Sequence, residues 1–279
     1  MRKIILNTTL ALALVISTKI EANNLNAPQN NHNLTNTVAQ PVQDNNAPQT
    51  AGQQNVANTQ QNLSLIKAID GNESTDKIKS LLEDPNIDVN AQDPEGIIAL
   101  HKAVDQNNAE VLKILLAHKD INVNAQDKYG GTALIMAVYY NNVDAVKILL
   151  AHKGIDVNAQ DKYGDTALMN AVKDGSLVVV KALLAHPNID VNYQSKYGDT
   201  ALMNAVKNNH LDVVGSLLAH PKIDINAQDK YGNTALSYLQ NIIAINIEKV
   251  LQTQNQSHSR RRRKKEAQNY VPKTQMIIK

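Results

Sequence analysis

The chain contains no cysteine, no tryptophan and no phenylalanine, so tyrosine supplies all of its aromatic content of 3%. Without cysteine, disulfide frameworks and thiolate zinc sites are excluded. Without large aromatic side chains, a core must be made of Leu, Val, Ile and Ala, and the 43% of hydrophobic residues is enough for one. Such a core suits thin, stacked helices. The lack of cysteine also fits an exported protein.

The motifs of common enzymes are missing as well. The sequence has no glycine-rich phosphate loop, no nucleophile elbow and no His-Glu-x-x-His helix. We therefore predict that the protein is not an enzyme, has no catalytic or metal site and uses no cofactor.

What the chain does contain is a repeat. Glycines recur at a constant interval of 34 residues, at Gly96, Gly130, Gly164, Gly198 and Gly232. Ala-Leu pairs such as Ala133-Leu134 and Leu-Leu pairs such as Leu149-Leu150 keep the same register. A fixed period of tens of residues is typical of a stacked-repeat protein.

One unit, residues 127–160, predicts the local structure. Asp127 and Gly130 hold the first and fourth positions of a type I turn, and Thr132 follows as a helix N-cap. Two short apolar helical faces come next, separated by Asn141-Asn142. Helices of about eight residues are marginal alone, so each unit must stack on its neighbours. The predicted fold class is all-α, a solenoid of helix-turn-helix units joined by turns.

The repeated Gly-x-Thr-Ala-Leu-x-x-Ala-Val, followed by Leu-Leu and Asp-Val-Asn-Ala-Gln-Asp, resembles the ankyrin repeat. The resemblance covers roughly residues 63–251. Alanine replaces the proline of the family signature in four units, and only His101 occupies its histidine position. The resemblance implies a protein that binds other proteins, of unknown identity, through exposed turn tips and the concave side of the stack.

The sequence predicts four regions. Met1-Arg-Lys and a mostly apolar run over residues 4–18 indicate a signal peptide, with a buried helix or an uncleaved anchor as the alternative. A spacer rich in Asn and Gln follows and should be disordered; a prion-like segment is the alternative. The predicted regions are 1–22 signal peptide, 23–62 spacer, 63–252 ankyrin-repeat domain (N-cap 63–90, four full units 91–226, degenerate C-cap 227–252) and 253–279 basic tail.

Charge is distributed unevenly along the chain. Residues 258–279 carry eight Lys/Arg and one Glu, whereas residues 22–257 have a net charge of −7. The cationic run consists of Arg260, Arg261, Arg262, Arg263, Lys264 and Lys265. It can be a solvated tail, a nuclear-localisation or nucleic-acid patch, or a segment that docks on the acidic body. No interleaved aromatics support base stacking, so we do not expect specific nucleic-acid recognition.

The best candidates for partner binding are the turn tips and the end of one helix. Tyrosine is enriched at protein interfaces, although duplication alone would also copy a Lys-Tyr pair into every unit. The candidate residues are Lys128, Tyr129, Tyr139, Tyr140, Lys162, Tyr163, Lys196, Tyr197, Lys230 and Tyr231.

One histidine per unit invites a metal hypothesis, at His118, His152, His186 and His220. Residues a whole repeat apart are too distant to share an ion at about 2 Å each. We predict instead that these histidines hydrogen-bond the links between units.

Together these features predict an exported or periplasmic protein-binding protein, with no membrane span once the signal peptide is removed. A host-directed effector that can enter a host nucleus is one form of this function. A periplasmic or envelope scaffold without a host target is the alternative.

Overall fold

The structure is a computed structural model, and it describes residues 63–268. The predicted signal peptide, the predicted spacer and the end of the predicted basic tail lie outside the described residues.

Helices account for nearly all of the regular structure. Residues 63–70 are helical. They are followed by α3 (Thr75–Leu82), α4 (Ala99–Asp105), α5 (Ala109–Leu116), α6 (Ala133–Tyr139), α7 (Val143–Leu150), α8 (Ala167–Lys173), α9 (Leu177–Leu184), α10 (Ala201–Lys207), α11 (Leu211–Leu218) and α12 (Ala235–Gln268). Over residues 63–268 there is no strand, only isolated bridges such as Gln126–Thr132. The predicted all-α class is confirmed.

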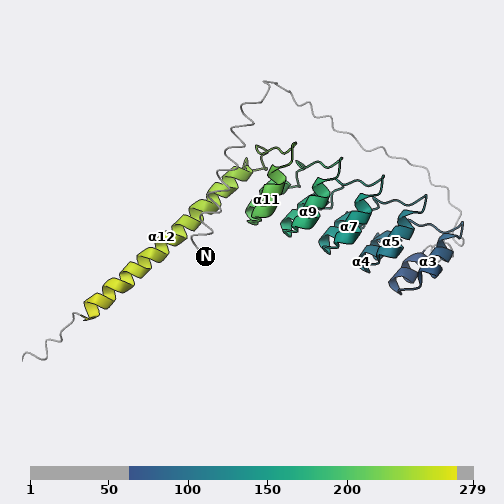
Figure 1. Ribbon diagram of the computed structural model, residues 1–279, viewed down its shortest axis with the longest axis horizontal. Coiled ribbons are helices and arrows are strands. Elements are labelled where there is room, and N and C mark those ends of the chain that lie inside the picture. The colour runs from purple at the N-terminus through teal and green to yellow at the C-terminus, as the bar shows by residue number, and fades with distance from the viewer. Residues whose placement is uncertain (1–62, 269–279) are drawn as a thin grey trace, which may run out of the picture.

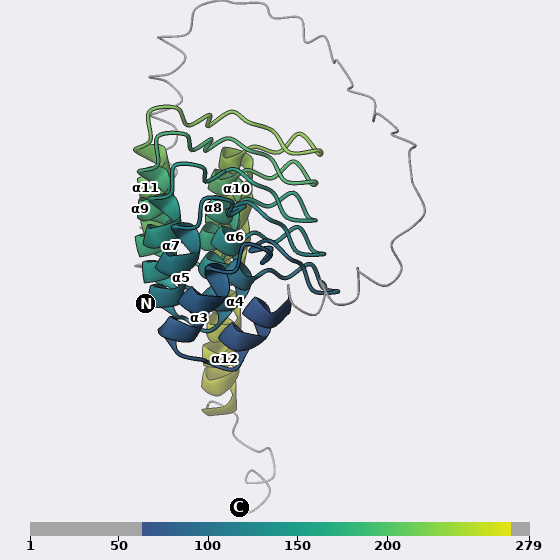
Figure 2. The same ribbon diagram turned by 90° about the vertical axis from the view of Figure 1, so that its right-hand side faces the viewer.

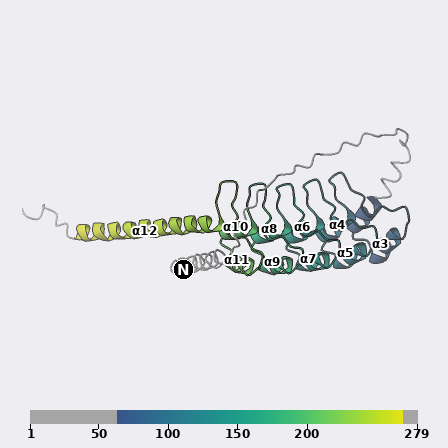
Figure 3. The same cartoon turned by 90° about the horizontal axis from the view of Figure 1, so that it is seen from above.

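The helices form two layers of a stack. Helices α4, α6, α8 and α10 pack side by side in one layer, and α5, α7, α9 and α11 in the other (Figure 3). Successive pairs advance along the stack from α3 to α11 (Figure 1). The long turns that join one unit to the next project beyond the α4–α10 layer as a row of loops (Figure 2). This layer and these turns therefore share one side of the molecule.

Capping residues set where each short helix begins. Thr132 accepts a hydrogen bond from the N–H of Ile135 and caps α6, as predicted. Asn142 caps α7 by accepting from Ala145. Asn141 has a φ of 50°, a left-handed conformation that asparagine tolerates and that ends α6. The Asn-Asn pair thus stops one helix and starts the next.

The core is aliphatic throughout. Leu149 and Val146 of α7 are fully buried, as are Ala137 of α6 and Ala171 of α8. Alanines at these positions let neighbouring helices approach closely. The stack buries its apolar residues between units, which no single unit could do alone.

Amide side chains in the links join each unit to the next. Asn158 donates to the carbonyl of Asn188 at 2.8 Å and accepts from the N–H of Asp190 at 2.8 Å. Gln126 likewise donates to the carbonyl of Gln160 at 2.9 Å. Asn90, Asn124, Asn192 and Gln194 make the same bonds in their own units. We call each such series of bonds from link to link a ladder. The ladders explain why the links repeat Asn and Gln.

Helix α12 departs from the expected unit because it runs for 34 residues without a break. In the other units the first helix ends at a residue of positive φ, namely Asn107, Asn141, Gly175 and Asn209. The same register falls on Ile243, and a β-branched residue strongly disfavours that conformation. The helix therefore continues across the predicted boundary at residue 252, and the described part of the predicted tail is helical.

Only the start of α12 belongs to the stack. Ala235 and Leu239 are buried, and Ile242 and Ile243 are partly buried against the core, whereas Ile245 is half exposed. Beyond that point the helix leaves the stack and projects from its end (Figure 1, Figure 3). No helix within residues 63–268 is long and apolar enough to cross a membrane.

Candidate functional site

The turn tips are fixed by a repeated set of backbone bonds. The Asp127 carboxylate accepts from the N–H groups of Tyr129 and Gly131, at 2.7 and 2.8 Å. Each tip then bonds to the next one, and the N–H of Lys162 donates to the carbonyl of Tyr129 at 2.8 Å. The Lys-Tyr residues are therefore held at a defined spacing, one per unit.

Glycine is required where the tips touch. Gly130 has a φ of 76°, and a Cβ atom there would lie 2.9 Å from the backbone nitrogen of Lys162. Both the left-handed conformation and the close approach exclude a side chain at this position. The left-handed conformation thus explains the 34-residue glycine period, and contact with the next tip adds to the requirement at positions such as Gly130.

The tyrosines of the tips are open to solvent. Tyr129 is 50% exposed, and its ring has the ammonium of Lys162 4.0 Å from the ring centroid. The same ammonium lies 5.0 Å from the ring of Tyr163. Both distances permit cation–π attraction. Lys162 therefore joins two successive tips through their rings.

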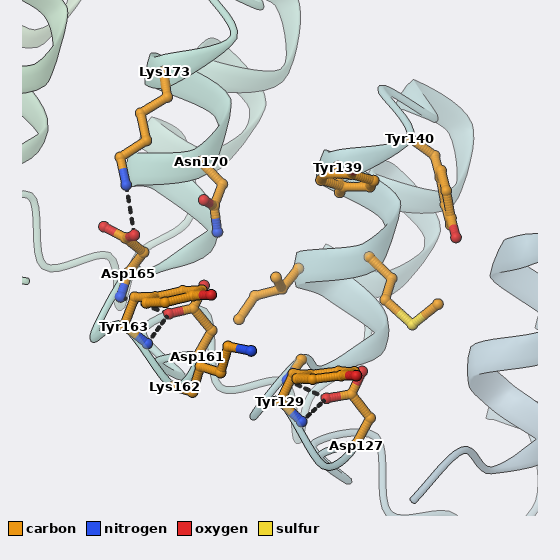
Figure 4. A pocket seen from close by; sticks show the side chains of 13 residues that line it. Asp127, Tyr129, Tyr139, Tyr140, Asp161, Lys162, Tyr163, Asp165, Asn170 and Lys173 are labelled. Atoms are coloured by element: carbon orange, nitrogen blue, oxygen red, sulfur yellow. Dashed lines mark hydrogen bonds and ion pairs between the residues drawn. The ribbon is translucent and has the colours of Figure 1, made fainter. Parts of the chain in front are cut away.

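A groove of about 540 Å³ lies between these tips and the helices α6 and α8. Tyr129 and Tyr163 form one wall, and Tyr139 and Tyr140 stand at the end of α6 on the other side (Figure 4). Tyr139 is 74% exposed and meets Tyr140 edge-on, with the ring centroids 5.5 Å apart. Four tyrosines thus surround one groove.

The α8 side of the groove is polar. Lys173, at the end of α8, forms an ion pair with Asp165 at 2.5 Å, and Asn170 lies beside them (Figure 4). Asp165 is buried, and its Oδ1 atom has no hydrogen-bond partner. The next unit repeats the pair with Lys207 and Asp199 at 2.5 Å.

The local environment shifts the pKa values of Tyr140 and Lys207, which lie on this side of the stack. Burial raises the pKa of Tyr140, and the neighbouring Asp105 carboxylate raises it further. Burial alone would lower the pKa of Lys207, but its hydrogen bond to Asp199 prevails and the pKa is raised. Tyr140 therefore stays neutral and Lys207 stays charged at neutral pH.

Five of the ten predicted binding residues meet in this groove: Tyr129, Tyr139, Tyr140, Lys162 and Tyr163. The other five do not line it. Lys128 forms an ion pair with Glu95 on the preceding tip. Tyr197 and Tyr231 are exposed on later tips, together with Lys196 and Lys230. Asp165, Asn170 and Lys173 complete the groove, although none of them is among the ten predicted binding residues.

The recurring histidines are bound to the links, as predicted. The ring Nδ1 of His152 accepts from the N–H of Gly154 at 3.1 Å. His118, His186 and His220 accept in the same way from the residue two positions later. Within residues 63–268, no group of three His, Cys, Asp or Glu residues is placed to hold a metal ion.

The cationic run lies far from the groove. Residues 260–265 belong to α12, which projects from the end of the stack (Figure 3). Arg260, Arg261 and Arg263 are exposed. The groove and the run are therefore separate surfaces.

Comparison with known proteins agrees with this geometry. The family model for ankyrin repeats (3 copies) matches residues 65–161 and 154–229. The crystal structure of EF0377, an ankyrin repeat protein, is 29% identical and aligns with a TM-score of 0.59 over 68% of this chain and 96% of that one. No curated protein matches the chain.

The family model spans more than half of the chain, and the solved structure shares its stacked helix pairs. Ankyrin repeats bind other proteins and generally serve as non-enzymatic interaction scaffolds. This protein belongs to the ankyrin-repeat family.

Proposed function

We propose that this protein is exported and binds a protein partner in the groove between the turn tips and helices α6 and α8. The observation that carries the proposal is the cluster of four exposed tyrosines around one groove. Tyrosine provides a large contact area with few rotamers to immobilise, and its hydroxyl can form a hydrogen bond. The groove lies on rigid elements, so little ordering would accompany binding.

The groove also suggests how a partner would be oriented. Its α6 side offers Met136, Tyr139 and Tyr140, whereas its α8 side offers the Asp165–Lys173 pair and Asn170. A segment with apolar groups at one end and hydrogen-bonding groups at the other matches this arrangement.

Export and delivery to a host are a further part of the proposal. The basic start and the apolar run of residues 4–18 support a signal peptide. A host-directed effector would use the exposed cationic run as a nuclear address. Cells that take up the full-length mature protein should show it in the nucleus, and changing residues 260–265 to alanine should leave it in the cytoplasm.

A periplasmic or envelope scaffold is the competing function. It would use the same groove but would remain with the cell that makes it. Fractionation of the producing cells distinguishes the two functions, because a scaffold is retained in the periplasm and an effector is released.

Site-specific photo-crosslinking tests the groove. A photoreactive residue at Tyr139 should crosslink a partner protein in the cell. The matched control is Val178, which is 58% exposed on α9 in the opposite layer. The same crosslinked band from both positions, or from Val178 alone, would contradict binding in the groove.

A further inference from the structure

We propose that the projecting end of α12 binds double-stranded nucleic acid without sequence preference, by contacting the phosphate backbone. The site is the segment around the cationic run, residues 260–265, and the ligand class is a duplex polyanion. The inference is independent of the groove and of its protein partner. It rests on three features of the helix: its charge spacing, its reach and its lack of an apolar face.

The charge spacing matches that of a duplex. Six consecutive cations on an α-helix follow one another at about 1.5 Å along the axis. Double-stranded DNA carries one negative charge per about 1.7 Å of its axis. The two linear charge densities are therefore nearly equal and opposite.

The arrangement around the helix axis favours a groove over a flat surface. Consecutive positions are about 100° apart, so residues 260–265 are distributed around the whole circumference. A flat membrane or protein surface can meet only one side of such a helix. A major groove is about 12 Å wide, accepts a helix, and has phosphates along both edges.

Projection from the stack makes the segment accessible. Arg260 follows Ile243, the last apolar residue of α12 that packs against the core, by 17 positions or about 25 Å along the helix. Arg260, Arg261 and Arg263 are exposed. The continuous helix also directs the cations away from its own stack (Figure 1), which argues against docking on the acidic body.

The rest of the molecule would confine binding to this end. Residues 63–257 hold 17 Lys/Arg and 23 Asp/Glu, a net charge of −6, and so repel a polyanion. From residue 252 to residue 265 the helix contains no Leu, Ile, Val, Phe, Trp or Met. An interfacial membrane helix needs a large apolar face, so a lipid surface is the poorer ligand.

The test is fluorescence anisotropy with a labelled mixed-sequence duplex of about 24 base pairs, titrated with the full-length mature protein at several salt concentrations. With five or six phosphate contacts, the slope of log K against log salt should be about −5. The affinity should fall about 10³-fold between about 50 and 200 mM salt. A second duplex of unrelated sequence should bind equally well.

Two variants make the test specific. Changing Arg260, Arg261, Arg262, Arg263, Lys264 and Lys265 to glutamine, a good helix former, should abolish the salt-dependent binding while circular dichroism shows an intact helix. Changing only the four arginines to lysine should preserve both the affinity and the slope. Equal binding by wild type and the glutamine variant, or loss of binding in the lysine variant, would overturn the proposal.

Two competing polyanions complete the test. One is a vesicle that contains phosphatidylserine, and the other is free poly-glutamate. The protein should bind each of them more weakly than the duplex at the same salt concentration. Tighter binding of either one would overturn the assignment in favour of a lipid or an acidic protein.

Discussion

Replacing a tip glycine by alanine should destabilise the stack, and the cost should depend on whether another tip follows. Gly130 and Gly232 have nearly the same φ, 76° and 78°. A Cβ at Gly130 would lie 2.9 Å from the backbone nitrogen of Lys162, whereas nothing lies within 4 Å of a Cβ at Gly232. Comparing the two alanine variants therefore distinguishes the cost of backbone strain, which both share, from the cost of contact with the next tip, which only Gly130→Ala has.

The expected magnitudes follow from these two terms. The left-handed conformation costs an alanine about 1–2 kcal/mol, and the smaller entropy of the unfolded chain offsets about 0.4–1 kcal/mol of that. Gly232→Ala should therefore destabilise by about 0–1.6 kcal/mol. Gly130→Ala adds an overpacking cost of about 1–3 kcal/mol because backbone must move.

Urea unfolding of the full-length protein, followed by circular dichroism, measures both variants. The midpoint for Gly130→Ala should lie clearly below that for Gly232→Ala. Equal midpoints, or a lower one for Gly232→Ala, would refute the conclusion that contact between tips requires the glycine.

Three further predictions concern the core, pH and the N-terminus. Leu149→Ala should lower the free energy of unfolding by about 2–5 kcal/mol and Tyr163→Ala by no more than about 0.5 kcal/mol; a larger loss for Tyr163→Ala in urea unfolding would reverse the assignment of inside and outside. Burial lowers the pKa of His101 below 6.5, so the unfolded state binds a proton more readily. Stability should thus decline as pH falls below about 6.5, and His101→Gln should remove this part of the pH dependence in thermal unfolding between about pH 7 and 5. N-terminal sequencing of exported protein should begin near Asn23, and an intact Met1 on a cytosolic product would contradict export.

Much of the stack was predictable because its determinants are local. The turn at Asp127 and Gly130, the cap at Thr132 and the helix break at Asn141 each depend on the conformational preference of one residue. The 34-residue period then repeats those preferences in every unit. The fold class and the positions of the short helices followed from these residues.

Other features depend on contacts that a sequence does not display. Asp165 and Lys173 are eight positions apart, and their ion pair spans the length of α8, from the turn before it to its last residue. The Asn158 ladder joins residues about one repeat apart and depends on the stacking distance. The sequence does carry a signal for the Asp165–Lys173 ion pair, because the next unit repeats the same eight-residue spacing between Asp199 and Lys207.

A sequence signal for the length of α12 lies at one position of the last unit. The register that places Asn209 in a left-handed conformation reaches Ile243 in the last unit, and a β-branched residue strongly disfavours the conformation that ends the helix in the other units. The prediction instead followed the weakening repeat to Leu251 and expected a separate tail. A test of every unit for its helix-ending residue would have predicted the longer helix.

The most direct test of the central claim is the affinity of the crosslinked partner for the wild type, for the Tyr139→Ala/Tyr163→Ala double variant and for Val178→Ala, measured by calorimetry. The groove variant should bind at least about tenfold more weakly, since buried interface tyrosines commonly contribute more than about 1 kcal/mol each. Val178→Ala should bind like the wild type. An unchanged affinity in the double variant, or a loss only in Val178→Ala, would contradict binding in the groove.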